Sequence, residues 1–339
     1  MKTADKLTIG DIARMAGVSK GSVSRVINHD PHGVSEGTRI RIWNIIEETG
    51  YVPNRLASGI TNSISKTIGL IIPDIQNMFF AQISRSVQDF AAENGYTVFL
   101  CNSDSDIEKE RTYIKTFAEK QVDGILINNC GENIGERTAK ILERSGIPIV
   151  ILDRRVSDFV SAPGIYADNE AGAYDGVNYL IKTGCRRVLF QGGPEGITTT
   201  MERLEGYRRA MSDAGLEIRT EDITFGDYSA ASGCKRTLEF LDNGIKPDAV
   251  FAGSDTIAIG VIKALNERGI KVPEEVSVLG FDGISFGEDV SPALTTVAQP
   301  IYEMGRHATK ILFSMIRGEE YPNTVEAFKT SLIIRESTR

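Results

Sequence analysis

The feature that most constrains the fold is an alternation, from residue 66 onward, of short β-branched runs and amphipathic helical segments. The runs are apolar on both sides, as in parallel strands whose two faces are covered by helices. We expect strands at 68–72, 97–100, 124–127, 147–152, 187–190, 249–252 and 277–280. Helices are expected between them, for example at 81–94, 171–182, 202–214 and 257–268. This order predicts a doubly wound α/β body, and because the repetition comes twice, we expect two similar lobes with parallel sheets.

The first 50 residues have a different, purely helical pattern. Thr8, with Asp11 three residues on, predicts a capped short helix that ends at Gly17. Ser19 begins a second helix, and Ser35 a third that runs to Gly50. The sequence therefore predicts an all-α head in which a helix, a short glycine-containing turn and a second helix follow one another.

The charge of the chain is distributed unevenly between these regions. Residues 1–62 hold eight Lys and Arg against six Asp and Glu, whereas the whole chain has a net charge of −8. A chain this acidic is not expected to coat nucleic acid along its length. The second helix of the head, however, carries short donors and basic groups, which a helix needs to reach base edges and phosphates in the major groove. These candidate DNA-binding residues are Ser19, Lys20, Ser22, Arg25 and Asn28.

Four stretches of the head resemble the lactose repressor family of bacterial transcription regulators. They are Thr-Ile-Gly-Asp-Ile-Ala at 8–13, Ala-Gly-Val-Ser at 16–19, Val-Ser-Arg-Val-Ile-Asn at 23–28 and Gly-Tyr-Val-Pro-Asn at 50–54. The resemblance implies DNA contacts by Thr8 and Asn54 as well. In the family the residues equivalent to Lys20 and Gly21 help to choose bases; Gly21 has no side chain, so one base contact is expected to be absent.

The resemblance also implies a hinge that becomes helical on DNA and inserts an apolar residue, here Ile60, into the minor groove. Gly59 precedes it and lowers helix propensity, so we expect a looser hinge than the family's. The expected domains are 1–50 for DNA binding, 51–65 for the hinge, and 66–339 for effector binding and dimerisation.

Polar and aromatic residues follow the expected strands of the body. Ligands of open α/β sheets bind beyond the carboxyl ends of the strands, so these residues form a candidate ligand site. The candidates are Asn77, Phe79, Phe80, Asn128, Asp153, Arg154, Arg203, Tyr228, Ser254, Asp282 and Gln299. Aromatic faces suit the C–H faces of a sugar, and planar Asp, Asn, Arg and Gln groups suit its hydroxyls. Asp255 is read either as a helix cap or as part of the site.

The body as a whole resembles the periplasmic-binding-protein-like core of the same family. Several stretches are similar to ribose-binding periplasmic proteins, namely 77–80, 127–128, 152–154, 280–283 and 298–299, together with Arg203 and Asp255. The similarity implies that Phe79, Phe80 and Tyr228 sandwich a sugar ring, and that the Asn, Asp, Arg and Gln candidates bind its hydroxyls. Ser254 stands where those proteins have Asn, which leaves space for a larger or differently configured sugar. The lobes are expected at 66–165 plus 300–325 and at 166–299 plus 326–339.

Other chemistries find little support in the sequence. The four cysteines form no Cys-x-x-Cys pair, there are three histidines, and no phosphate-binding or dinucleotide-binding glycine loop is present. We therefore expect no metal, no cofactor and no catalytic step. The chain has no apolar run near the ~20 residues that a membrane helix needs and no leader-like start, so we expect a cytoplasmic protein without membrane contact.

These patterns predict a repressor that binds a palindromic operator as a homodimer and responds to a monosaccharide. One recognition helix reads too few bases, which is why a two-fold dimer is expected. One alternative is a regulator of the same family that responds to a purine or a phosphorylated metabolite, although Asp153 and Asp282 would repel phosphate. A sugar-binding protein without a regulatory role is a further alternative, but it would have no use for a DNA-binding head.

Overall fold

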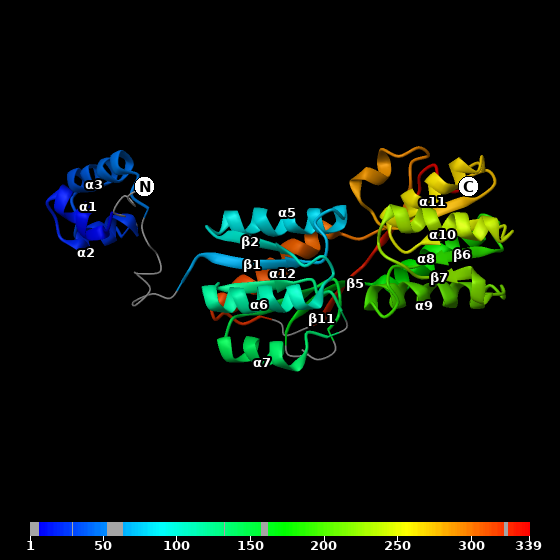
Figure 1. Ribbon diagram of the computed structural model, residues 1–339, viewed down its shortest axis with the longest axis horizontal. Helices are drawn as coiled ribbons and strands as arrows, with labels where there is room; N and C mark the ends of the chain where they lie inside the picture. Colours follow the sequence, from blue (N-terminus) through cyan, green and yellow to red (C-terminus); the bar gives the residue numbers. More distant parts are fainter. Residues whose placement is uncertain (1–6, 29, 53–63, 132, 157–161, 322–324) are drawn as a thin grey trace, which may run out of the picture. The chain divides into compact units, whose positions relative to one another are not determined.

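The computed structural model describes residues 7–28, 30–52, 64–131, 133–156, 162–321 and 325–339. The chain divides into two compact units, Met1–Ser65 and Lys66–Arg339, which we call the head and the body. Figure 1 shows the helices of the head and the two α/β lobes of the body. None of the helices in the described part of the chain combines the length and apolar character needed to span a membrane.

The head contains the three expected helices, α1 (Ile9–Ala16), α2 (Lys20–Ile27) and α3 (Glu36–Thr49). Thr8 and Asp11 form a reciprocal capping box at the start of α1, and Gly17 ends the helix with a φ of 65° that favours glycine. Apolar residues from all three helices, including Ile12, Val23 and Ile42, pack into one small core.

The first lobe is built on a parallel sheet of six strands in the order β11-β5-β4-β3-β1-β2. The strands are β1 (Thr67–Ile72), β2 (Thr97–Asn102), β3 (Gly124–Ile127), β4 (Ile149–Leu152), β5 (Gly164–Ala167) and β11 (Val325–Phe328). One face packs against α5 (Met78–Glu93) and α12 (Ile301–Ile316), and the other against α6 (Ile107–Lys120) and α7 (Glu136–Ser145). Both faces are thus covered, which explains why the strands read as continuous apolar runs.

The second lobe repeats this plan with the order β12-β10-β9-β8-β6-β7. Its strands are β6 (Val188–Gln191), β7 (Ile223–Thr224), β8 (Ala249–Ala252), β9 (Ser277–Asp282), β10 (Thr295–Ala298) and the antiparallel β12 (Ser331–Ile333). One face packs against α8 (Asn169–Lys182) and α9 (Thr198–Asp213), and the other against α10 (Ala230–Asp242) and α11 (Asp255–Glu267).

The chain passes between the two sheets three times, after β5, after β10 and after β11. The last passage corrects the expected lobe boundary: β11 belongs to the first sheet, so the first lobe extends through Phe328 instead of ending near residue 325. Helix α5 also begins at Met78, three residues before the expected start, because Asn77 caps it.

Candidate functional site

In the head, the basic and amide side chains of α2 lie on the face opposite its buried residues. Lys20, Arg25 and Asn28 are exposed, whereas Val23 and Val26 are buried in the head core. The exposed face therefore has the charge and hydrogen-bonding groups of a helix that reads a major groove.

The hydroxyl groups proposed for DNA binding are partly used within the head. Thr8 Oγ1 donates to Asp11 at 2.6 Å and accepts from the Asp11 amide at 3.3 Å. Ser19 Oγ accepts from the Ser22 amide at 3.1 Å and lies 3.0 Å from Ser22 Oγ. These groups fix the start of α1 and α2, so any DNA contact they make is additional to a capping role. Asn54 and Ile60 lie outside the described residues.

In the first lobe, polar candidates gather directly after β3 and β4. Asn128 Nδ2 donates to Asp153 Oδ2 at 3.3 Å, and Arg154 Nη1 donates to the carbonyl of Asn129 at 3.1 Å. Asp153 has a φ of 66°, a left-handed conformation that is uncommon outside glycine. This turn aims a carboxylate and a guanidinium, which are adjacent in sequence, into one buried region; each residue is 5% exposed.

In the second lobe, Arg203 and Asp282 form the centre of a buried network. Arg203 donates to Asn169 Oδ1 at 2.9 Å and to the Gly253 carbonyl at 2.5 Å, and its Nη2 lies 3.2 Å from Asp282 Oδ1. Gln299 donates to the same Asp282 oxygen at 2.8 Å. Asp282, like Asp153, has a positive φ, here 117°.

The two groups of side chains interact across the lobes. Burial raises the pKa of the Asp153 carboxyl, and this rise is opposed by the positive charges of Arg154 in the same lobe and of Arg203 in the other. The Arg154 guanidinium lies 5.7 Å from the ring centre of Phe80 in the first lobe and 5.8 Å from that of Tyr228 in the second. The backbone amide of Arg155 donates to Thr198, and its side chain pairs with Glu202 at 3.1 Å. Asp153, Arg154 and Asp282 thus converge on one enclosed region.

The aromatic candidates differ from the arrangement that the resemblance implied. The rings of Phe79 and Phe80 meet edge to face, with centroids 5.2 Å apart and planes at 80°. Because the rings are nearly perpendicular, they cannot both lie flat against one sugar ring, so a sandwich of Phe79, Phe80 and Tyr228 is wrong in that form. Both phenylalanines belong to the core of the first lobe, and Tyr228 is held by a 2.7 Å hydrogen bond between its hydroxyl and Thr200.

Asn77 and Ser254 are buried caps at the helix starts that border the site. Asn77 Oδ1 accepts from the Phe79 amide at 3.0 Å, and Ser254 Oγ accepts from the Ile257 amide at 3.2 Å. Each oxygen thus uses one of its two acceptor sites on the backbone, and the Asn77 amide nitrogen and the Ser254 hydroxyl proton remain as donors for a ligand.

Several buried polar atoms of the network lack a hydrogen-bond partner within the described residues. They are Asn128 Oδ1, Asp153 Oδ1, Arg154 Nε and Gln299 Oε1. Buried polar groups in folded proteins are nearly always paired, so unsatisfied groups gathered in one place indicate a binding site. Three acceptors and one donor match a ligand that carries several hydroxyl groups, since each hydroxyl can both donate and accept.

Asp255 has a structural role behind the site. Its carboxylate accepts from the amides of Gly283 and Ile284, each at 2.8 Å, and from the Thr296 hydroxyl at 2.5 Å. Asp255 therefore holds the turn that follows Asp282. Burial, and then the negative charge of Asp282, raise the pKa of the Asp255 carboxyl.

This raised pKa predicts a pH-dependent stability. The pKa of the Asp255 carboxyl is higher in the folded state than in the unfolded state. Such a carboxyl stabilises the fold fully below its ordinary pKa of about 4. This stabilisation is lost as the pH rises through the folded-state pKa. Without a charge, Asn can keep both backbone hydrogen bonds on its oxygen and donate its NH₂ group to the Thr296 hydroxyl, which can also accept. We expect Asp255→Asn to gain about 1 kcal/mol or more relative to the parent chain between about pH 5 and about pH 8.

The measurement is urea unfolding of both chains across that pH range, with Asp175→Asn, at an exposed position of α8, as the control. A difference between Asp255→Asn and the parent that stays constant with pH, as expected for the control, would contradict the raised pKa.

Four residues of the network were missed by sequence reasoning. Asn129, Asn169 and Glu202 each bind one of the buried or bridging arginines, and Arg155 joins the lobes. Arg155 and Glu202 are sequence neighbours of Arg154 and Arg203, and that adjacency was the available signal. The sequence carried no such signal for Asn169, because its contact with Arg203 is created by the packing of α8 on α9.

Comparisons with known proteins identify the family of the head and of the body. Residues 8–54 match a family model described as "Bacterial regulatory proteins, lacI family", and residues 177–338 match one described as "Periplasmic binding protein-like domain". Catabolite control protein A of Priestia megaterium is 35% identical over 98% of this chain and 99% of its own length. The ribose operon repressor of Halalkalibacterium halodurans is 35% identical over 98% of this chain and 97% of its own.

Among solved structures, the lac repressor dimer bound to operator and the anti-inducer ONPF has a similar fold. Its TM-score is 0.85 at 27% identity, with 98% of this chain and 99% of the repressor chain covered. The similarity extends over the head and the body alike.

Proposed function

Because the chain belongs to the LacI family of bacterial regulatory proteins, we propose that it is a repressor whose operator affinity is controlled by a pentose or hexose bound between the lobes of the body. The observation that carries the proposal is the buried network with unsatisfied polar atoms contributed by both lobes, on Asn128, Asp153, Arg154 and Gln299. A neutral polyol satisfies such a network without adding charge to it.

The charges of the network favour a sugar over a phosphorylated metabolite. Burial raises the pKa of the Asp282 carboxyl; the positive charge of Arg203 opposes this rise, and the negative charge of Asp153 adds to it. A phosphate group would add two negative charges beside two carboxylates in a region of low dielectric, which is unfavourable. One aromatic face, that of Phe80 or Tyr228, remains for the C–H face of a sugar ring. The name of the ribose operon repressor fits a sugar effector but does not identify the one bound here.

For DNA binding, we assign the exposed face of α2 to the major groove. Lys20, Arg25 and Asn28 supply donors for base edges and phosphates, with Thr8, Ser19, Ser22 and Asn54 as further contacts. Ile60 is assigned to the minor groove. Residues 1–50 would thus form the DNA-binding domain, 51–65 the hinge and 66–339 the effector-binding core, and the protein would act in the cytoplasm.

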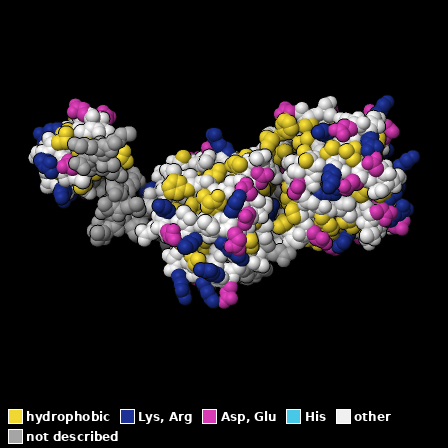
Figure 2. All heavy atoms as spheres, viewed as in Figure 1, with side chains coloured by type: hydrophobic (Ala, Val, Ile, Leu, Met, Phe, Trp, Pro, Cys, Tyr) yellow, Lys and Arg dark blue, Asp and Glu magenta, His cyan; other side chains and the backbone are white. Residues whose placement is uncertain are grey.

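We assign dimerisation to apolar surfaces on both lobes of the body. Phe99, Tyr302 and Phe286 are each more than 40% exposed. In the second lobe a hollow of about 510 Å³ is lined partly by Ile259, Ile262 and Val290. Figure 2 shows hydrophobic side chains exposed on one face of both lobes. A two-fold dimer would place two heads on a palindromic operator.

Control of DNA binding follows from different affinities of the sugar for two arrangements of the lobes. Asp153 and Arg154 belong to the first lobe, whereas Arg203 and Asp282 belong to the second. A sugar held by both groups stabilises the arrangement in which the lobes are closest. The sugar shifts operator affinity only to the extent that this arrangement presents the heads differently.

We expect one pentose or hexose to change operator affinity by about 5-fold to about 150-fold, the range of typical allosteric coupling. The measurement is fluorescence anisotropy of labelled operator with the full chain, titrated with a panel of pentoses, hexoses, purine nucleosides and sugar phosphates. A response confined to a nucleoside or a sugar phosphate would contradict the sugar assignment, while operator binding itself would still hold.

A further inference from the structure

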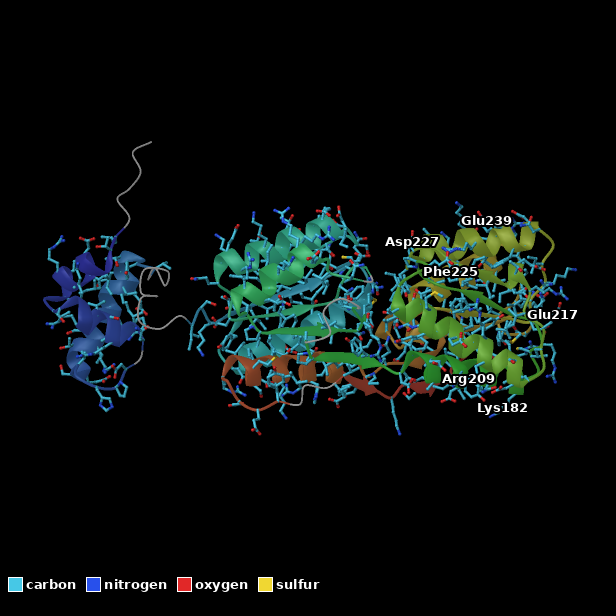
Figure 3. All side chains as sticks on the ribbon, turned by 90° about the horizontal axis from the view of Figure 1, so that it is seen from below. Lys182, Arg209, Glu217, Phe225, Asp227 and Glu239 are labelled. Atoms are coloured by element: carbon cyan, nitrogen blue, oxygen red, sulfur yellow. The ribbon has the colours of Figure 1, made fainter. Side chains whose placement is uncertain are left out.

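A second groove lies away from the sugar network, at the edge of the second sheet. One wall is residues 223–225, which include β7, and the other is a face of α10 that carries Ser232, Lys235, Arg236 and Glu239. Its volume of about 460 Å³ is in the range of small-molecule sites. Figure 3 labels Phe225, Asp227 and Glu239 on this side of the second lobe.

Arg236 is a buried cation with incomplete pairing. The residue is 8% exposed, and its Nη1 has no hydrogen-bond partner within the described part of the chain. Its Nη2 donates to Ser232 Oγ, one helical turn earlier. Burial lowers the pKa of the guanidinium, while the charges of Asp227 and Glu239 raise it. Since a buried charge without a hydrogen-bonded counter-ion is unfavourable, Arg236 needs an explanation beyond packing.

The groove contains a second unsatisfied group and a net positive charge. Thr224 Oγ1 is buried and also lacks a partner among the described residues. Lys235 is exposed at the rim and pairs only loosely with Glu239, at 3.9 Å. The lining therefore carries two cations and one carboxylate, and it includes Thr224 and Arg236, which come from different elements and each carry an unsatisfied donor atom.

We propose that this groove binds the phosphate or carboxylate group of a small metabolite, with Arg236 Nη1 and Thr224 Oγ1 as the donors. A planar guanidinium and a hydroxyl form the charge-assisted pair that such oxyanions prefer. Ile223 and Phe225 supply apolar contact for the rest of the molecule. This groove is separate from the proposed sugar site. The sugar site lies between the lobes, and its ligand carries no charge.

The groove is connected to the sugar network through one loop. The Arg236 guanidinium packs so closely on Gly226 that any side chain there would overlap it. Two residues later the loop carries Tyr228, whose ring packs on Gly193 and faces Arg154. An anion that draws Arg236 toward the groove therefore acts on the loop that positions Tyr228.

The test is thermal unfolding of the full chain, without sugar, in inorganic phosphate, in succinate as the carboxylate probe, and in chloride of equal ionic strength. At about ten times Kd, the binding anion is expected to raise the Tm of the parent chain by about 3 °C. Arg236→Gln should abolish this rise and Thr224→Val should reduce it. Arg219→Gln, which removes an exposed arginine paired with Glu217, is the matched control and should keep the rise.

The variants also separate a binding role from a structural one. In chloride, Arg236→Gln should be as stable as the parent or more stable, because it removes a buried charge that lacks a full partner. General stabilisation by phosphate, or phosphate bound by the head, would affect every variant equally. Equal Tm rises in the parent, Arg236→Gln and Thr224→Val, or no rise with either anion, would overturn the proposal. If Arg236→Gln fails to fold, the Tm rise of Thr224→Val tests the proposal by itself: a reduced rise supports the groove, and a parental rise overturns it.

Discussion

Asp282→Asn is expected to weaken binding of the effector sugar about 100-fold. In the structure one Asp282 oxygen accepts from both Arg203 and Gln299, so the carboxylate is held in place with its second oxygen available to sugar hydroxyls. Hydrogen bonds to a charged group contribute about 1.5–3 kcal/mol each. An amide has one acceptor oxygen instead of two, and its NH₂ group would face donors, either Arg203 and Gln299 or the sugar.

The measurement is titration calorimetry of the full chain with the sugar found in the operator-binding panel. Asp289→Asn, at an exposed position, is the matched control and should leave sugar affinity unchanged. Operator affinity without sugar should be the same for both variants and the parent. Sugar binding by Asp282→Asn at parental affinity would refute the assignment of the network as the effector site.

Arg25→Ala is expected to lower operator affinity about 10-fold to about 100-fold while sugar affinity stays unchanged. Arg25 is exposed, as are Lys20 and Asn28, and a bidentate arginine contact with a base is worth about 1–3 kcal/mol. If Arg25 instead binds a phosphate, the loss will be similar for all DNA sequences and the salt dependence of binding will fall by about one counter-ion.

The experiment compares operator with scrambled DNA over a range of salt concentrations. Arg41→Ala removes the same charge from an exposed position of α3 and serves as the control. If Arg41→Ala loses as much operator affinity as Arg25→Ala, only the net charge of the head matters. If Arg25→Ala binds the operator with parental affinity, Arg25 is not part of the DNA interface.

Most central strands of both sheets could be predicted because helices cover both of their faces, although β5 and β10, which are also buried, were not expected. Residues of β3, β4, β6 and β8 are all buried, so each appears in the sequence as an apolar run, except for Gln191 at the end of β6. The outer strands lack that signal. β7 has two residues, and β11 alternates exposed and partly buried positions, so pairing with the rest of the sheet defines them as strands.

The candidate site was predictable to the extent that chain direction determines it. Because parallel strands end at the same edge of a sheet, Asn128 and Asp153 could be expected to lie together in the first lobe, and Asp282 and Gln299 in the second. The hydrogen-bond partners of these side chains could not be predicted from the sequence. Whether Asp255 faces a ligand or the backbone depends on the amides of Gly283 and Ile284, 28 and 29 residues away. The angle between Phe79 and Phe80 likewise depends on how α5 packs on the sheet.

Asp153 and Asp282, two residues of the candidate site, both have a left-handed backbone conformation. Holding a non-glycine residue in that region costs about 1–3 kcal/mol. Glycine at Asp282 would release this cost, but it would leave the Arg203 guanidinium buried without its carboxylate, a loss of about 3–5 kcal/mol. A search for heat-tolerant variants should therefore leave Asp282 unchanged, so the demands of folding alone would preserve the residue proposed to sense the sugar.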